Sequence, residues 1–192
     1  MKKLILIMLL LAFYVSASSQ SEWILDKSHA RLGFSIVHQS ISEVEGNFKN
    51  FDVTLKSLKD DFTDATIELS ADVGSINTDI EMRDTHLKSA AFFDVDKFKT
   101  ITFKSTSFTK INNKSYKLKG NITIHGITKP IELAVVYNGS YVNSKRNTVS
   151  AGFTVNGTLN RTDFGVGGEP SFISLAGEVQ IKSNLEFTKN SK

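Results

Sequence analysis

The residues that could carry metal chemistry in this chain are its four histidines. His29, His38, His86 and His125 are the soft ligands available to zinc, because the chain contains no cysteine. Their spacing forms neither an HxH nor an HExxH motif, so no metal site is indicated by a signature. A zinc site built from distant histidines that the fold brings together stays open. We nevertheless predict no metal and no resident cofactor, with His38 and His125 bonded to backbone groups at strand ends.

A catalytic serine or a phosphate-binding loop is not indicated either. The chain has many serines, but none lies in a Gly-x-Ser-x-Gly turn. The glycine-rich stretch from Gly165 to Gly168 follows a predicted strand without opening a helix, which argues against a dinucleotide or P-loop site. We expect this stretch to form a mobile loop.

Two arginine–aspartate groups lie beside aromatic residues. Arg83 and Asp84 precede a phenylalanine pair, and Arg161 precedes Asp163 and Phe164. In one interpretation these charges only fasten an insertion and a strand end. In the other, Arg83 or Arg161 meets the polar head of a ligand, because a guanidinium suits phosphate oxygens. An enzyme that uses His86, Asp84 or Arg161 as acid, base or electrophile is an alternative, but we predict a protein without catalytic residues.

The segment 82–95 interrupts a chain that otherwise alternates apolar and polar residues. Thr78 and Glu81 have the spacing of a capping box, and Asp84 and Lys88 stand four apart. These features predict one or two helical turns. The segment is expected to cover an end or side of the fold.

Period-two alternation elsewhere predicts eight principal strands. They are expected at residues 30–38, 45–55, 66–73, 101–111, 115–125, 129–137, 148–159 and 174–187, with turns at Asn112-Asn113 and Asn138-Gly139. Eight long antiparallel strands favour a closed up-and-down barrel, because closure removes exposed edges. The helical insertion falls between strands 3 and 4. A two-sheet sandwich, or an outer-membrane barrel with its apolar face turned to lipid, stays open as an alternative.

The N-terminus has the pattern of a secretory signal peptide. Lys2 and Lys3 precede an apolar run and a serine-rich stretch, so we assign residues 1–19 to the signal and 20–192 to a single domain. The apolar run is too short for a permanent membrane span. Without Lys2 and Lys3 the 23 basic residues fall to 21 against 20 acidic ones, and no basic cluster indicates nucleic acid. We predict a periplasmic or secreted protein.

Eight short motifs resemble the YceI-like family in order and spacing. They are Trp23-x-x-Asp26-x-x-His29, Gly33-Phe34-x-x-x-His38, Gly46-x-Phe48, Arg83-Asp84-x-His86-Leu87, Phe92-Phe93-Asp94-Val95, Phe103-x-Ser105, Gly120-x-x-Thr123-Ile124-His125-Gly126-x-Thr128-Lys129-Pro130 and Asn160-Arg161-x-Asp163-Phe164-Gly165. The resemblance implies a lipocalin-like antiparallel barrel that binds a polyisoprenoid or prenyl quinone. It supplies no catalytic residues.

Together these observations predict an exported protein that sequesters or carries an isoprenoid-tailed lipid inside its barrel. The predicted cavity lining is Phe34, Ile36, His38, Phe48, Leu87, Phe92, Phe93, Phe103, Ile124, Phe153 and Phe164, with Arg83 and Arg161 as head-group contacts. The alternative is that these side chains fill a dry core and the barrel serves stress or interaction functions. The oligomeric state is left open, with a homodimer as one alternative.

Overall fold

The computed structural model describes residues 21–168 and 175–191, and the predicted signal peptide lies outside them. The strands are β1 (Ser21–Leu25), β2 (Arg31–His38), β3 (Ser42–Phe48), β4 (Phe51–Ser57), β5 (Thr66–Asp72), β6 (Ile76–Asn77), β7 (Thr100–Lys110), β8 (Ser115–Ile124), β9 (Ile127–Asn143), β10 (Thr148–Asn160) and β11 (Leu175–Asn190). The helices are α1 (Glu81–Lys88) and the short 3₁₀ turns η1 (Lys27–His29), η2 (Val73–Ser75) and η3 (Arg161–Phe164).

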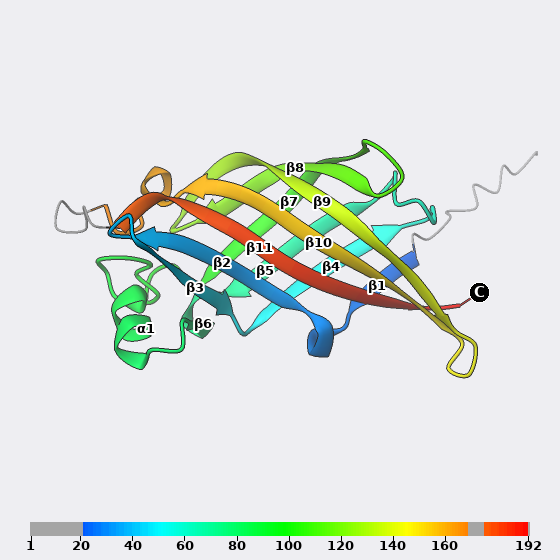
Figure 1. The fold of residues 1–192 in the computed structure, drawn as a ribbon, viewed down its shortest axis with the longest axis horizontal. Coiled ribbons are helices and arrows are strands. Elements are labelled where there is room, and N and C mark those ends of the chain that lie inside the picture. The colour runs from blue at the N-terminus through cyan, green and yellow to red at the C-terminus, as the bar shows by residue number, and fades with distance from the viewer. Residues whose placement is uncertain (1–20, 169–174, 192) are drawn as a thin grey trace, which may run out of the picture.

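The strands form one antiparallel sheet that closes on itself (Figure 1). Its order runs β1-β4-β5-β7-β8-β9-β10-β11, and β1 returns to pair with β11. The remaining strands β2, β3 and β6 continue from β11 toward the end of the barrel that holds α1. The described part of the chain therefore forms a barrel and not a two-sheet sandwich.

The first three strand positions of the barrel are each split in two. β1 pairs with the C-terminal half of β11 and β2 with its N-terminal half. β4 and β3 pair with these two, and β5 and β6 pair with β4 and β3 in turn. The Lys49 N–H donates to the carbonyl oxygen of Ser75 at 3.1 Å, which ties the second break to the third. With each split pair counted as one position, the barrel has eight antiparallel strands, and the predicted fold class is confirmed.

Three predicted strand boundaries are wrong. The strand expected over residues 45–55 is broken between Phe48 and Phe51. The hairpin expected at Asn112-Asn113 has a longer loop, because β7 ends at Lys110 and β8 begins at Ser115. The turn expected at Asn138-Gly139 lies inside β9, since Gly139 takes a φ of +129° beside a register shift and so forms a β-bulge instead of a turn.

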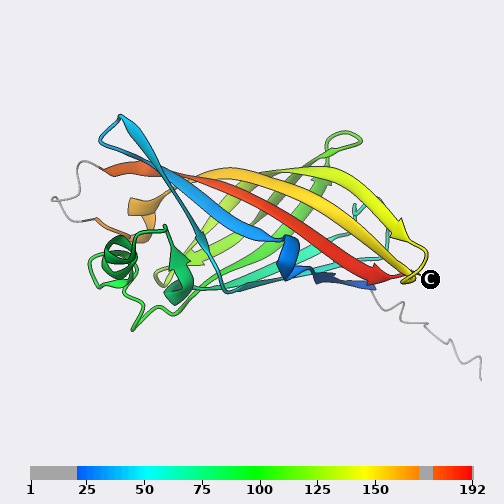
Figure 2. The same ribbon diagram turned by 60° about the horizontal axis from the view of Figure 1, so that its bottom comes forward.

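The insertion between the third and fourth strand positions is confirmed as helical. Among the described strands β6 pairs with β3 alone, and α1 packs beside that end of the barrel (Figure 2). The predicted capping box is wrong, because Ile80 takes the N-cap position and makes no side-chain cap bond. Thr78 instead donates its backbone N–H and its hydroxyl to Asp84, at 2.8 and 2.6 Å. We call residues 78–99 the cover.

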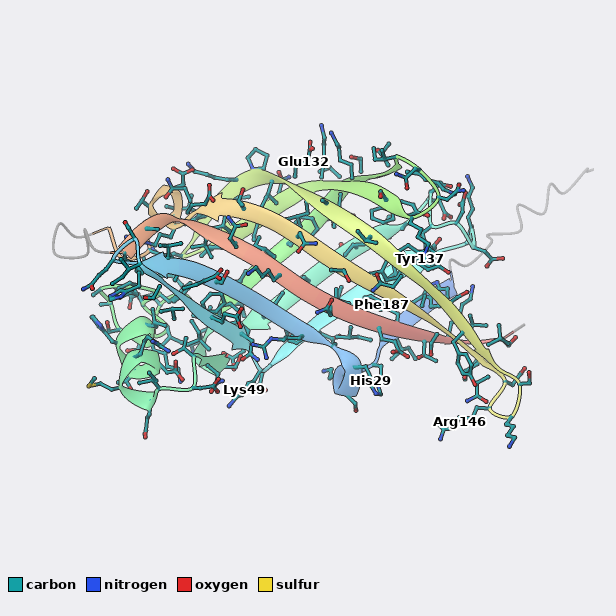
Figure 3. All side chains as sticks on the ribbon, in the orientation of Figure 1. His29, Lys49, Glu132, Tyr137, Arg146 and Phe187 are labelled. Atoms are coloured by element: carbon teal, nitrogen blue, oxygen red, sulfur yellow. The ribbon has the colours of Figure 1, made fainter. Side chains whose placement is uncertain are left out.

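The apolar face of the strands points into the barrel. Along β11 the inward residues are Leu175, Val179, Ile181, Ser183, Leu185 and Phe187. Charged residues such as Glu132 on β9 stand on the outer surface (Figure 3). This orientation is opposite to the lipid-facing alternative, in which apolar residues point outward. Among the described residues, no helix is both long and apolar enough to cross a membrane.

Candidate functional site

The barrel encloses an apolar cavity of about 460 Å³. Every strand of the closed ring except β1 contributes side chains to the cavity wall, together with β2, β3, β6, the cover and η3. The polar residues in its wall are His38, Thr78, Arg83, His86, Arg161 and Ser183. A filled, dry core is contradicted by this volume, which falls within the range of about 300–1,000 Å³ typical of small-molecule sites.

The structure places every predicted site residue in the wall of this cavity. The eleven predicted lining residues, from Phe34 on β2 to Phe164 in η3, all line it, as do Arg83 and Arg161. Period-two alternation finds the lining residues that lie on strands, because side chains at i and i+2 face the same side of a strand. The lining residues of the cover and η3 follow instead from the aromatic residues beside the two arginine–aspartate groups. That these residues contact a ligand stays a prediction.

One end of the cavity stops at Phe153 and Phe187, and further aromatic rings lie behind them. Phe62 is 1% exposed, and its ring centroid lies 5.0 Å from that of Phe153, 5.6 Å from Tyr137 and 5.2 Å from Trp23. Figure 3 labels Tyr137 and Phe187 in the half of the barrel away from α1. We call the layer of Trp23, Phe62 and Tyr137 the floor.

The opposite end of the cavity lies under the cover, and we call it the mouth. Leu87, Phe92 and Phe93 of the cover line the cavity, and the Phe93 ring meets Phe48 edge-on at 6.2 Å. His86 is exposed to solvent and also lines the cavity. The cavity therefore reaches the molecular surface at this end.

Arg161 occupies the mouth as a buried cation with carbonyl partners. Its Nε donates to Ala176 at 2.9 Å, its Nη2 to Leu175 at 3.1 Å, and its Nη1 to Val166 at 2.8 Å and to Gly167. Within the described residues no carboxylate forms an ion pair with it. Burial lowers the pKa of the guanidinium. Its positive charge therefore stands near the cavity without an anionic partner among the described residues.

The sequence comparison decides the family. A model of the YceI-like domain matches residues 23–187. The chain belongs to the YceI-like family. A UPF0312 protein of Staphylococcus aureus is 36% identical over 169 residues, covering 85% of this chain and 95% of the relative.

Solved structures share the fold of this chain. The Campylobacter jejuni YceI protein is 32% identical, with a TM-score of 0.70 over 88% of this chain and 96% of that one. A polyisoprenoid binding domain from Saccharophagus degradans is 14% identical, with a TM-score of 0.63 over 90% of this chain and 99% of that one. The second likeness shows the fold alone.

The residues that the enzymatic alternative uses as acid, base or electrophile have structural partners in this chain. Asp84 accepts two hydrogen bonds from Thr78, and Arg161 binds four backbone carbonyls. Arg83 also binds Thr78, through Nε to the hydroxyl and Nη2 to the carbonyl, both at 2.7 Å. The ring of His86 packs edge-on against Phe92 at 5.0 Å. Asp84 and Arg161 therefore hold the mouth together.

The remaining histidines lie in different places. His38 ends β2 and lines the cavity, whereas the Nδ1 of His125 lies 3.1 Å from the carbonyl oxygen of Phe164. His29 lies outside the barrel on η1 (Figure 3), where its ligand atoms come within 4.8 Å of those of Asp26 and Glu186. A hydrogen bond that the His29 ring donates to the Asp26 carboxylate raises the pKa of His29. In this triad only His29 is exposed and the two carboxylates are half-buried, and none of the three lines the cavity.

Sequence analysis missed three residues that shape the site. Phe62 lies in the stretch 59–64, which reads as a polar turn, and only a lone aromatic among aspartates signals its burial. Thr78 was assigned to helix capping, but it joins Arg83 to Asp84. Ser183 interrupts an apolar inward row on β11, and its buried Oγ has no hydrogen-bond partner among the described residues.

Proposed function

We propose that this protein is an exported binding protein that sequesters or carries an isoprenoid-tailed lipid or prenyl quinone. The observation that carries the proposal is the continuous apolar cavity, about 460 Å³ in volume, between the floor and the mouth. Each CH₂ group that leaves water for such a cavity contributes roughly 0.8 kcal/mol. A tail of several isoprene units therefore binds without specific polar contacts, even after the costs of association and ordering.

The mouth suits a polar head group. Arg83 is half-buried there and uses Nε and Nη2 on Thr78, while Nη1 has no hydrogen-bond partner among the residues described. Arg161 donates four hydrogen bonds to backbone carbonyl oxygens, which do not neutralise its positive charge. Both favour an oxygen-rich or anionic head at the end of the tail.

Three further observations support the proposal. The Saccharophagus degradans domain, which has the same fold, is described as polyisoprenoid binding. The pattern of residues 1–19 supports export to the periplasm or secretion. The arrangement of Asp84 and Arg161 as mouth-forming residues supports binding without catalysis.

Analysis of the protein as purified tests the proposal. The chain from residue 20 onward is extracted with organic solvent, and the extract is examined by mass spectrometry for prenyl compounds. The delipidated protein is then titrated with a prenyl quinone and, as a control, with the same quinone ring without a tail. We expect the tailed compound to bind and the bare ring not to bind. A barrel that is empty as purified and also fails to take up the tailed quinone would contradict the proposal.

A further inference from the structure

The cavity is elongated along the barrel axis. At about 3.3 Å per residue and a strand tilt of roughly 40°, the part of β11 from Leu175 at the mouth to Phe187 spans roughly 30 Å of the barrel axis. A volume of about 460 Å³ spread over that length gives a cross-section of roughly 15 Å². This is the mean area open to the centres of ligand atoms, so the cavity is much longer than it is wide. A ligand tail therefore lies along the axis and ends near Phe153.

The floor behind Phe153 depends on Phe62. The Phe62 ring contacts Phe153 edge-on at 5.0 Å, and Tyr137 stands 5.5 Å from the same ring. Neither Phe62 nor Tyr137 lines the cavity, so both lie behind its last layer. Without Phe62, the Phe153 ring would have an empty space to move into, and the cavity would lengthen.

Phe62 is held in place by the turn between β4 and β5. The carboxylate of Asp64 accepts the Ser57 hydroxyl at 2.6 Å and the Leu58 N–H at 2.9 Å, and the Tyr116 hydroxyl donates to the carbonyl oxygen of Asp61 at 2.8 Å. Phe62 takes a φ of +58°, which is a rare backbone conformation for a bulky residue. Such a conformation persists where the surrounding contacts over-determine it, and it is often found at functional positions.

We propose that Phe62 sets the longest tail that the barrel accepts, by fixing Phe153 as the end of the cavity. This inference rests on the proposed function, because it assigns a length limit to the same ligand site. Tail carbons up to the floor each add contact with the wall. Carbons beyond this limit must stay at the mouth in water, so they add no affinity.

A chain-length series tests the inference. Prenyl quinones that differ only in the number of isoprene units are titrated into the wild-type protein, Phe62→Leu and Leu118→Phe. The Tyr116 hydroxyl binds the turn that carries Phe62, and Leu118 is the next residue on β8 that lines the cavity. The larger side chain of Leu118→Phe therefore shortens the cavity at its floor end. Affinity for wild type is expected to rise with tail length and then level off. The limit should move to longer tails in Phe62→Leu and to shorter tails in Leu118→Phe.

A matched control separates tail length from stability. Phe98 is half-buried against His125 and does not line the cavity, so Phe98→Leu should leave the limit unchanged. For a tail one unit beyond the wild-type limit, Phe62→Leu is expected to bind at least about tenfold more tightly. An unchanged limit in the folded variants would overturn the inference and leave the proposed function standing. If Phe62→Leu does not fold, an unchanged limit in Leu118→Phe decides against it. If no prenyl quinone binds to wild type, both fail.

Discussion

The ring of Phe92 lies directly against Gly167. A Cβ atom on Gly167 would stand 2.6 Å from Cε1 of Phe92 and 2.8 Å from Nη1 of Arg161. Gly167 also has a φ of +60°, which L-residues rarely adopt. The cover and the glycine-rich stretch after η3 therefore meet at a point that only glycine fits, and the mobile loop predicted for residues 165–168 is fastened there by Arg161.

Replacing Gly167 with alanine should destabilise the mouth. We expect Gly167→Ala to lower the free energy of unfolding by about 2–4 kcal/mol, because alanine disfavours the left-handed backbone and its Cβ displaces the Phe92 ring. Chemical denaturation would measure the free energy of unfolding. Gly168→Ala is the matched control, because a Cβ at Gly168 meets no atom of the described residues within 4 Å. Equal stability of the two variants would contradict the close packing of Phe92 on Gly167.

Thr78 should hold the cover closed. Thr78→Val keeps the shape but removes the hydroxyl that donates to Asp84 at 2.6 Å and accepts from Arg83 at 2.7 Å. Since Thr78 is buried, losing these two hydrogen bonds should lower the free energy of unfolding by about 1–3 kcal/mol. Hydrogen exchange within the cover should accelerate more than exchange at the floor. Thr85→Val on the exposed face of α1 serves as control, and similar exchange in both variants would argue against this role.

Acid should weaken the turn that carries Phe62. Burial acts to raise the pKa of Asp64, but hydrogen bonds from Ser57, Leu58 and Lys59 outweigh it and hold the pKa below the ordinary value of 3.8. A depressed folded-state pKa stabilises the protein at pH values above the unfolded pKa, and this contribution is lost as pH falls through the folded pKa. At neutral pH, Asp64→Asn should lower the free energy of unfolding by about 1–3 kcal/mol.

The pH dependence itself gives the check for Asp64. Unfolding of wild type and Asp64→Asn is followed from neutral pH to about pH 2, and the difference should shrink below about pH 4. Asp60→Asn is the control. Because the Asp60 side chain is 97% exposed, this substitution should change the free energy of unfolding little. A difference that stays constant down to the lowest pH would show that the charge of Asp64 is not responsible.

Gly46 should keep the cavity open near the mouth. The Phe34 ring lies over Gly46, so a Cβ there would stand 2.4 Å from Cζ of Phe34. Gly46→Ala must push this ring toward the cavity, and prenyl quinone affinity should fall about tenfold. Equilibrium dialysis with the tailed quinone measures the change. Gly152→Ala, whose Cβ would meet Asn138 at 3.6 Å, should bind like wild type. Unaltered binding by a folded Gly46→Ala protein would refute this role.

The barrel and its inner face could be predicted from the sequence, whereas the cavity could not. Alternation fixes which side chains share a face, so residues such as Phe103 and Phe153 were placed correctly. Whether inward side chains meet at the axis depends on strand tilt and stagger, which alternation does not encode. The floor was missed because Phe62 is brought inward by turn hydrogen bonds, mainly to Asp64, and not by a strand.

The predicted strand boundaries are wrong where long-range backbone pairing outweighs the local composition. Asn138-Gly139 has the composition of a tight turn, yet β9 continues through it because β10 stays paired on both sides of a bulge. The break after Phe48 is set by long-range bonds, such as the Asn50 N–H to the Ser75 hydroxyl at 3.0 Å. Such partners lie far apart in the chain, so no local window contains them.

The split strand positions make the two ends of the barrel structurally different. The β1–β11 pairing closes the ring only at the floor end, while the mouth end finishes at β6 with the cover beside it. Displacing the cover would break no strand pairing of the closed ring. The barrier to loading a ligand therefore resides in the packing and hydrogen bonds of the cover, whereas the pairing that completes the closed ring lies at the other end of the molecule.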